Sequence, residues 1–71
     1  MPHIAITMIP GRNREEKAAL AKKVQMFLVE ELNLDAKYVS VSIEDIPKEH
    51  WNDSMNTIPA EIMFVKPGGS I

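Results

Sequence analysis

The sequence predicts an α/β (α+β) domain built on one βαβ unit. Two short segments with alternating apolar side chains, residues 2–9 and 39–44, are typical of strands. Between them, residues 13–32 carry apolar side chains at helical spacing. Strands joined by a helical connection of this length are expected to be parallel neighbours in a sheet. With 71 residues, the chain is expected to form a single domain, residues 1–71.

The two predicted strands each present one apolar face. In residues 2–9, Ile4 and Ile6 share a face with Met8, and Pro10-Gly11 then ends the strand. In the second strand apolar residues alternate with polar ones, Val39, Val41 and Ile43 against Ser40, Ser42 and Glu44.

The predicted helix has a clear start and an apolar stripe. Asn13 stands three residues before Glu16, which is the spacing of a capping box. The stripe consists of apolar residues at helical spacing, Leu20, Val24, Phe27, Leu28 and Leu32. Charged residues occupy the other side, so the stripe is expected to lie against another apolar surface.

The last third of the chain is less regular. Residues 47–51 predict one helical turn opened by Pro47, followed by a polar loop at residues 52–56. Apolar residues spaced by four and three then predict a short helix at residues 58–65, with a strand as the alternative. The tail at residues 68–71 is expected to be flexible unless a partner subunit orders it.

The small size of the chain predicts self-association. A domain of about 60 residues buries only roughly 60% of its unfolded surface, so disulfides, a metal or oligomerisation usually stabilise it. The chain has no cysteine, and its two histidines, His3 and His50, are too far apart in sequence to suggest a closed zinc site. Oligomerisation is the remaining means of stabilisation.

Charge and hydropathy argue against two classes of partner. The net charge of -2, from eight Lys/Arg and ten Asp/Glu, lacks the basic stripe of a nucleic-acid binder. No apolar run approaches the ~20 residues that span a bilayer, and the N-terminus has no export signal. We therefore expect a soluble, cytoplasmic protein without nucleic-acid or membrane partners.

Pro2 is the most informative candidate for chemistry. Removal of Met1 is expected because proline is small, and it would leave Pro2 with a secondary amine at the N-terminus. An apolar setting or a nearby cation favours the neutral form of an amine, and a neutral amine near pH 7 is a good general base. The alternatives are that Pro2 only begins an edge strand, or that a retained Met1 converts its nitrogen into a non-basic amide.

Arg12 and Trp51 are further candidates. The Arg12 guanidinium could bind a substrate carboxylate or stabilise charge on a carbonyl oxygen, and the alternative is a solvated loop arginine. Trp51, the only tryptophan, either lines a pocket or belongs to the core. His3 and His50 present the same choice between a site and ordinary structure.

Considered together, several features of the chain resemble the tautomerase superfamily, specifically its short-chain 4-oxalocrotonate tautomerase family. These features are the Met1-Pro2 start, Gly11-Arg12 before a long helix, the second strand of residues 39–43 and Trp51. The resemblance covers nearly the whole chain. It implies a βαβ subunit whose two-stranded parallel sheet is completed to four strands by dimerisation.

The resemblance also implies an activity. The family's amino-terminal proline moves a proton between an enol and its keto tautomer, without a cofactor or a metal. By this resemblance Pro2 is the base and acid, and Arg12 engages the substrate, often from a neighbouring subunit. Trp51 corresponds to an aromatic residue that makes the pocket apolar.

Ser40 departs from the hexameric members, which have a second arginine at this position. A serine does not polarise a carbonyl as a cation does, so chemistry on diacids is not expected. The ending Lys66-Pro67-Gly68 is similar to the dimeric bacterial phenylpyruvate-tautomerase-like subgroup. The resemblance thus implies a homodimer acting on a 2-oxo acid enol such as phenylenolpyruvate, with Ser40 in the substrate site and a hexamer as the alternative.

Two other functions remain open at this point. A protonated Pro2 would serve as an acid for hydration or dehalogenation of unsaturated acids. A non-enzymatic, oligomeric binding module with the same fold would also be consistent with Ser40 and with a retained Met1.

Overall fold

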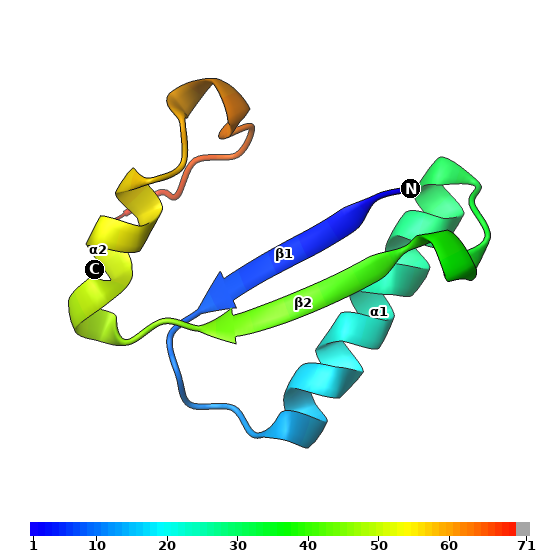
Figure 1. Ribbon diagram of the computed structural model, residues 1–71, viewed down its shortest axis with the longest axis horizontal. Helices are drawn as coiled ribbons and strands as arrows, with labels where there is room; N and C mark the ends of the chain where they lie inside the picture. The colour runs from blue at the N-terminus through cyan, green and yellow to red at the C-terminus, as the bar shows by residue number, and fades with distance from the viewer. Residues whose placement is uncertain (70–71) are drawn as a thin grey trace.

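A computed structural model describes residues 1–69, and these residues contain the predicted βαβ unit (Figure 1). Its elements are β1 (His3–Met8), α1 (Arg14–Leu32), the 3₁₀ turn η1 (Ala36–Tyr38), β2 (Ser40–Asp45), α2 (Lys48–Asn56) and the 3₁₀ turn η2 (Ala60–Ile62). Within the described residues the strands form a two-stranded sheet. None of the helices in this part of the chain is long and apolar enough to cross a membrane.

The strands are parallel, as the sequence predicted. The register places His3 opposite Ser40 and Ile6 opposite Ile43. Because side chains alternate across a strand, Ile6 and Ile43 share the face that α1 covers, and His3 and Ser40 lie on the other face. Among residues 1–69, no other helix or strand lies against that second face (Figure 1).

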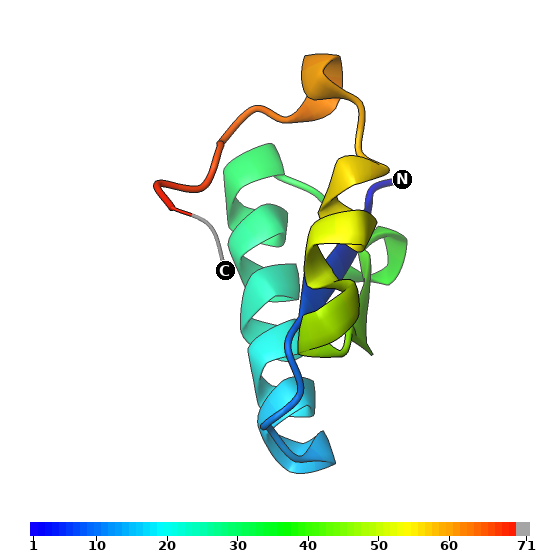
Figure 2. The same ribbon diagram turned by 90° about the vertical axis from the view of Figure 1, so that its left-hand side faces the viewer.

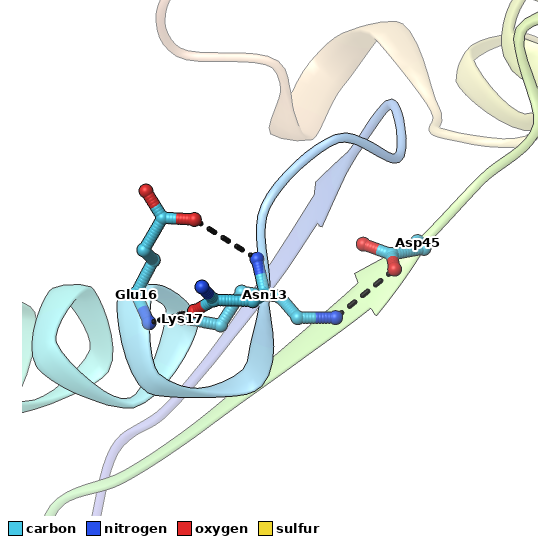
Figure 3. A network of polar contacts seen from close by, with 4 residues as sticks. All are labelled: Asn13, Glu16, Lys17 and Asp45. Atoms are coloured by element: carbon cyan, nitrogen blue, oxygen red, sulfur yellow. Dashed lines mark hydrogen bonds and ion pairs between the residues drawn. The ribbon is translucent and has the colours of Figure 1, made fainter.

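The start of α1 has the predicted capping box. The Asn13 side-chain oxygen accepts a hydrogen bond from the Glu16 backbone N–H at 2.8 Å, and the Glu16 carboxylate accepts one from the Asn13 N–H at 3.0 Å. One residue later, the Lys17 ammonium lies 3.0 Å from the Asp45 carboxylate (Figure 3). This ion pair joins the first turn of α1 to the end of β2.

The core of the single chain is small. Val39, which is 5% exposed, is the only buried apolar residue among those described. Next to it, the Gln25 side-chain amide donates hydrogen bonds to the backbone oxygens of Ala36 and Val39, at 3.0 and 3.1 Å. These bonds attach the η1 connection to the middle of α1.

The apolar stripe of α1 only partly packs as predicted. Leu20, Val24 and Leu28 are half-buried, but Phe27 and Leu32 are 61% and 53% exposed. A sheet of two strands about 4.8 Å apart is narrower than a helix with its side chains, which is about 10 Å across. It therefore covers only part of the stripe, and Phe27 and Leu32 stay exposed in the single chain.

The predicted polar loop at residues 52–56 is also wrong, because α2 continues to Asn56. Trp51, Ser54 and Met55 are half-buried and follow helical spacing. One face of the helix is therefore partly buried, although the segment is mostly polar. Pro47 has ψ 144° and stands just before the helix, as its cap, and not in its first turn.

The predicted helix at residues 58–65 is reduced to η2. Pro59 has an extended backbone with ψ 141°, and the following Phe64 and Val65 are 91% and 86% exposed. A short helix is stable in water only when its apolar face packs against another element, and within residues 1–69 the side chains of Phe64 and Val65 have no such packing. Residues 70–71 of the predicted tail lie outside the described residues.

Candidate active site

Pro2 lies immediately before β1 and is half-buried. Its backbone oxygen accepts a hydrogen bond from the Ser40 N–H at 3.3 Å, which holds the start of β1 against the start of β2. Met1 is 97% exposed, so the bond between Met1 and Pro2 is accessible to an aminopeptidase. Its cleavage would convert the Pro2 nitrogen from an amide into a secondary amine.

Three polar side chains lie together beside Pro2, on the sheet face away from α1. The His3 ring nitrogen Nδ1 is 2.7 Å from the Ser40 hydroxyl, and its Nε2 is 3.0 Å from the Ser42 hydroxyl. All three side chains are solvent-exposed in the single chain. The sequence left the role of His3 open, whereas the structure connects both of its ring nitrogens to β2.

Arg12 lies at the opposite end of β1, in the loop that leads to α1. It is exposed and has no hydrogen-bond or ion-pair partner within residues 1–69. Gly11, which precedes it, has φ 148°, a conformation that residues with a side chain rarely adopt. Since a strand rises about 3.3 Å per residue, the six residues of β1 separate Pro2 from Arg12 by roughly 20 Å.

Trp51 lies at the same end of the molecule as Arg12. It belongs to α2, which begins three residues after β2 ends, and parallel strands end at the same edge of a sheet. Figure 1 and the rotated view in Figure 2 both place α2 beyond the carboxyl ends of the strands, with α1 on one side of the sheet. Trp51 is half-buried, and His50 beside it is exposed.

The structure therefore divides the predicted site residues into two groups. Pro2 and Ser40 are neighbours, together with His3, while Arg12 and Trp51 are at the other end of the strands. The proximity of His3 to Ser40 and Ser42 could have been recognised only from the register of the two strands, which makes their polar residues neighbours on one face.

Two surface hollows of the described residues lie elsewhere. They form a shallow groove between α1 and β2, with an apolar floor that includes Ala21, Val41 and Ile43 and a basic rim at Arg14 and Lys17. None of the predicted site residues lines this groove. Among residues 1–69, no three His, Cys, Asp or Glu side chains lie close enough together to hold a metal ion.

Comparison with known proteins identifies relatives over most of the chain. A family model described as "Tautomerase enzyme" matches residues 2–52, a segment that contains all four predicted site residues. A 2-hydroxymuconate tautomerase of Comamonas testosteroni is 43% identical over 51 residues, which cover 72% of this chain and 81% of that protein.

Two other relatives differ in how much of their length is matched. A probable tautomerase of Xylella fastidiosa (strain 9a5c) is 37% identical over 72% of this chain, and the match spans only 62% of that protein. Tautomerase PptA of Escherichia coli O127:H6 is 32% identical over the full length of both chains.

Proposed function

Because the chain belongs to the tautomerase family, whose characterised members are isomerases, we propose that it is a cofactor-free keto–enol tautomerase with Pro2 as its general base and acid. The observation that carries this proposal is the family match over residues 2–52, which begins at Pro2. The exposed Met1 supports it, because the catalytic amine forms only when Met1 is removed. A cytoplasmic location stays a prediction.

The proposed reaction needs one base that returns the proton it takes. The neutral Pro2 nitrogen accepts the proton of the enol hydroxyl, and the electron pair of that O–H bond forms the carbonyl. The carbon–carbon double bond then takes a proton from the resulting Pro2 ammonium, so the substrate is isomerised and the amine is regenerated. General acid–base catalysis of this kind contributes about 10² to 10⁴-fold.

The complete site is proposed to form between two subunits. In the described chain both strands have an unpaired edge, and β1 of one copy can pair antiparallel with β1 of another about a two-fold axis. This pairing would place the start of one β1 beside the end of the other. Pro2 would then face Arg12 and Trp51 of the partner subunit in a homodimer, with a hexamer as the alternative assembly.

The residues around Pro2 favour an enol with a single carboxylate. Arg12 of the partner subunit would bind that carboxylate through its guanidinium. Ser40, which is uncharged, would face the oxygen that becomes the carbonyl, and apolar surroundings from Trp51 would favour the neutral amine. Phenylenolpyruvate has these features: one carboxylate, one enol oxygen and an apolar ring.

An ultraviolet assay of enol decay tests this function. Wild-type protein whose intact mass shows loss of Met1 should accelerate the ketonisation of phenylenolpyruvate, and Pro2→Ala should reduce the rate by at least about 10²-fold. Equal rates for wild type and Pro2→Ala would exclude Pro2 as the base. If the protein hydrates an unsaturated acid or releases halide from it and does not accelerate ketonisation of the enol, the hydratase or dehalogenase alternative is favoured. If it acts on neither the enol nor the unsaturated acid, a binding module is favoured.

A further inference from the structure

We propose that His3 is a positioning residue that holds the Ser40 hydroxyl as a hydrogen-bond donor to the substrate oxygen, and that Ser42 fixes the His3 ring for this purpose. The inference rests on the proposed tautomerase function and deepens it. It assigns to two further residues a part in the site beside Pro2. It also explains how an uncharged serine could assist a reaction in which negative charge grows on an oxygen.

The geometry gives the three side chains a defined order. His3 lies between the two serines, with Nδ1 at 2.7 Å from Ser40 and Nε2 at 3.0 Å from Ser42. Both distances are within the range of ordinary hydrogen bonds. A histidine held at both nitrogens cannot rotate about its side-chain bonds without breaking one of these contacts, although its surroundings are exposed.

The direction of the hydrogen bonds follows from what each group can donate. A neutral imidazole carries a proton on one nitrogen and accepts at the other. If the proton is on Nδ1, His3 donates to the Ser40 oxygen, and the Ser42 hydroxyl donates to Nε2. The Ser40 hydrogen is then free to point away from His3, toward a bound substrate.

This order matters because the opposite tautomer would disable Ser40. With the proton on Nε2, the Ser40 hydroxyl would donate to Nδ1 and would offer a substrate oxygen only lone pairs. Ser42 is well placed to select the useful tautomer when it acts as a donor to Nε2. A chain of hydrogen bonds that all run in one direction also strengthens its last donor.

The position of this hydrogen-bonded series relative to Pro2 gives it a function. The Ser40 N–H donates a hydrogen bond to the backbone oxygen of Pro2, so Ser40 is a neighbour of the residue that carries the proposed base. When Pro2 removes the enol proton, negative charge develops on the enol oxygen, and a pre-oriented hydroxyl stabilises it. The donor is neutral, which suits a substrate whose only carboxylate is bound by Arg12 of the partner subunit.

Two substitutions of His3 separate positioning from a general structural role. Asparagine places its amide nitrogen close to the position of Nδ1, and glutamine places it close to Nε2. His3→Asn can still donate to Ser40, whereas His3→Gln keeps only the contact with Ser42. We expect His3→Gln to lower kcat for phenylenolpyruvate by roughly 10-fold with little change in KM, and His3→Asn to retain most of the activity.

The same experiment includes Ser40→Ala and the double variant. His3→Gln should have no further effect when Ser40 is already alanine, because His3 acts through that hydroxyl. Full additivity of the two losses, or equal loss in His3→Asn and His3→Gln, would overturn the inference while leaving the tautomerase function intact. Wild-type protein without tautomerase activity would overturn both the proposed function and the role of His3. The assay of wild-type protein shows this before any His3 variant is made.

A measurement of the ring itself does not depend on activity. In the neutral imidazole, ¹⁵N chemical shifts of His3 should show the proton on Nδ1, and Ser42→Ala should shift the tautomer population toward Nε2–H. His50→Gln serves as the control that identifies the second histidine's signals. A proton found on Nε2 of His3 in wild-type protein would overturn the inference.

Discussion

Pro2 and Arg12 lie beyond opposite ends of the same strand, β1. Pro2 contacts the start of β2 through its backbone oxygen, whereas Arg12 is exposed beyond the strand's end. No rotation of the Arg12 side chain bridges a distance of roughly 20 Å. If both residues act on one substrate, they must come from two chains.

This separation predicts that two inactive variants restore activity when mixed. Pro2→Ala and Arg12→Ala homodimers should each be inactive. In a mixed dimer, one site combines the intact Pro2 of one chain with the intact Arg12 of the other, and the second site has neither. Random exchange after denaturation and refolding should therefore recover about one quarter of the wild-type activity.

The control for this experiment is a mixture of each variant with itself, refolded in the same way. A second control mixes the double variant Pro2→Ala/Arg12→Ala with either single variant. No mixed dimer then contains both an intact Pro2 and an intact Arg12, so no activity should be recovered. Absence of recovery in the mixture of single variants, with mixed dimers shown by mass spectrometry, would contradict a shared site.

The exposed Met1 leads to a second prediction, about processing. Protein made in a bacterial cytoplasm should lack Met1 by intact mass, because Met1 is 97% exposed and followed by a small residue. A lysine inserted between Met1 and Pro2 should keep the fold but abolish catalysis, since the Pro2 nitrogen is then an amide without a basic lone pair. Unchanged activity with the insertion would show that the Pro2 amine is not used. Circular dichroism checks that the fold is retained.

The βαβ unit was predictable because its signals are local. Alternation in the two strands and the spacing of Asn13 and Glu16 each depend on a few neighbouring residues, and the structure contains both features. The errors concern segments whose state depends on packing. Residues 58–65 form only the short turn η2, because exposed apolar side chains such as Phe64 and Val65 lack a packing partner in the single chain.

The site was predictable only in part, for a related reason. Pro2 could be named from its type and position and Ser40 from the family resemblance, but their proximity follows from the register of strands that are distant in sequence. The two hydrogen bonds of His3 connect residues 37 and 39 positions apart, and no local pattern indicates them. The separation of Arg12 from Pro2 likewise follows only from the length of β1.

Gln25 provides a third prediction, about stability. Its amide donates two hydrogen bonds to backbone oxygens of η1 and the following residue, and these oxygens lie next to the buried Val39. Gln25→Ala should lower the free energy of unfolding by about 1–2 kcal/mol. Gln25→Glu should cost more, because a carboxylate cannot donate to these oxygens and repels them.

Urea unfolding monitored by circular dichroism measures these differences. Lys22→Ala, on the same helix but exposed, is the matched control and should change stability by less than about 0.5 kcal/mol. If Gln25→Glu were as stable as wild type, the hydrogen bonds from Gln25 would not contribute to holding η1 on α1.

The fourth prediction concerns assembly. It follows from several large apolar side chains that are exposed to solvent in the isolated chain. Phe64 is 91% exposed and Val65 is 86% exposed, and Phe27 on α1 is 61% exposed. Contiguous exposed apolar surface usually marks an interaction surface. Sedimentation at micromolar concentration should give at least a dimer, and the thermal midpoint should rise with protein concentration because association stabilises the folded state.

Phe64 should contribute directly to this association. Burying a phenylalanine contributes about 1.5–3 kcal/mol, and a symmetric dimer buries two copies, so Phe64→Ser should raise the dissociation constant by roughly 10² to 10⁴-fold. Lys66→Ser, an exposed neighbour, is the control and should change it little. A shared active site links this result to catalysis: specific activity of Phe64→Ser should fall as the protein is diluted and recover when it is concentrated. A stable, folded monomer with full activity at nanomolar concentration would contradict both the interface and the shared site.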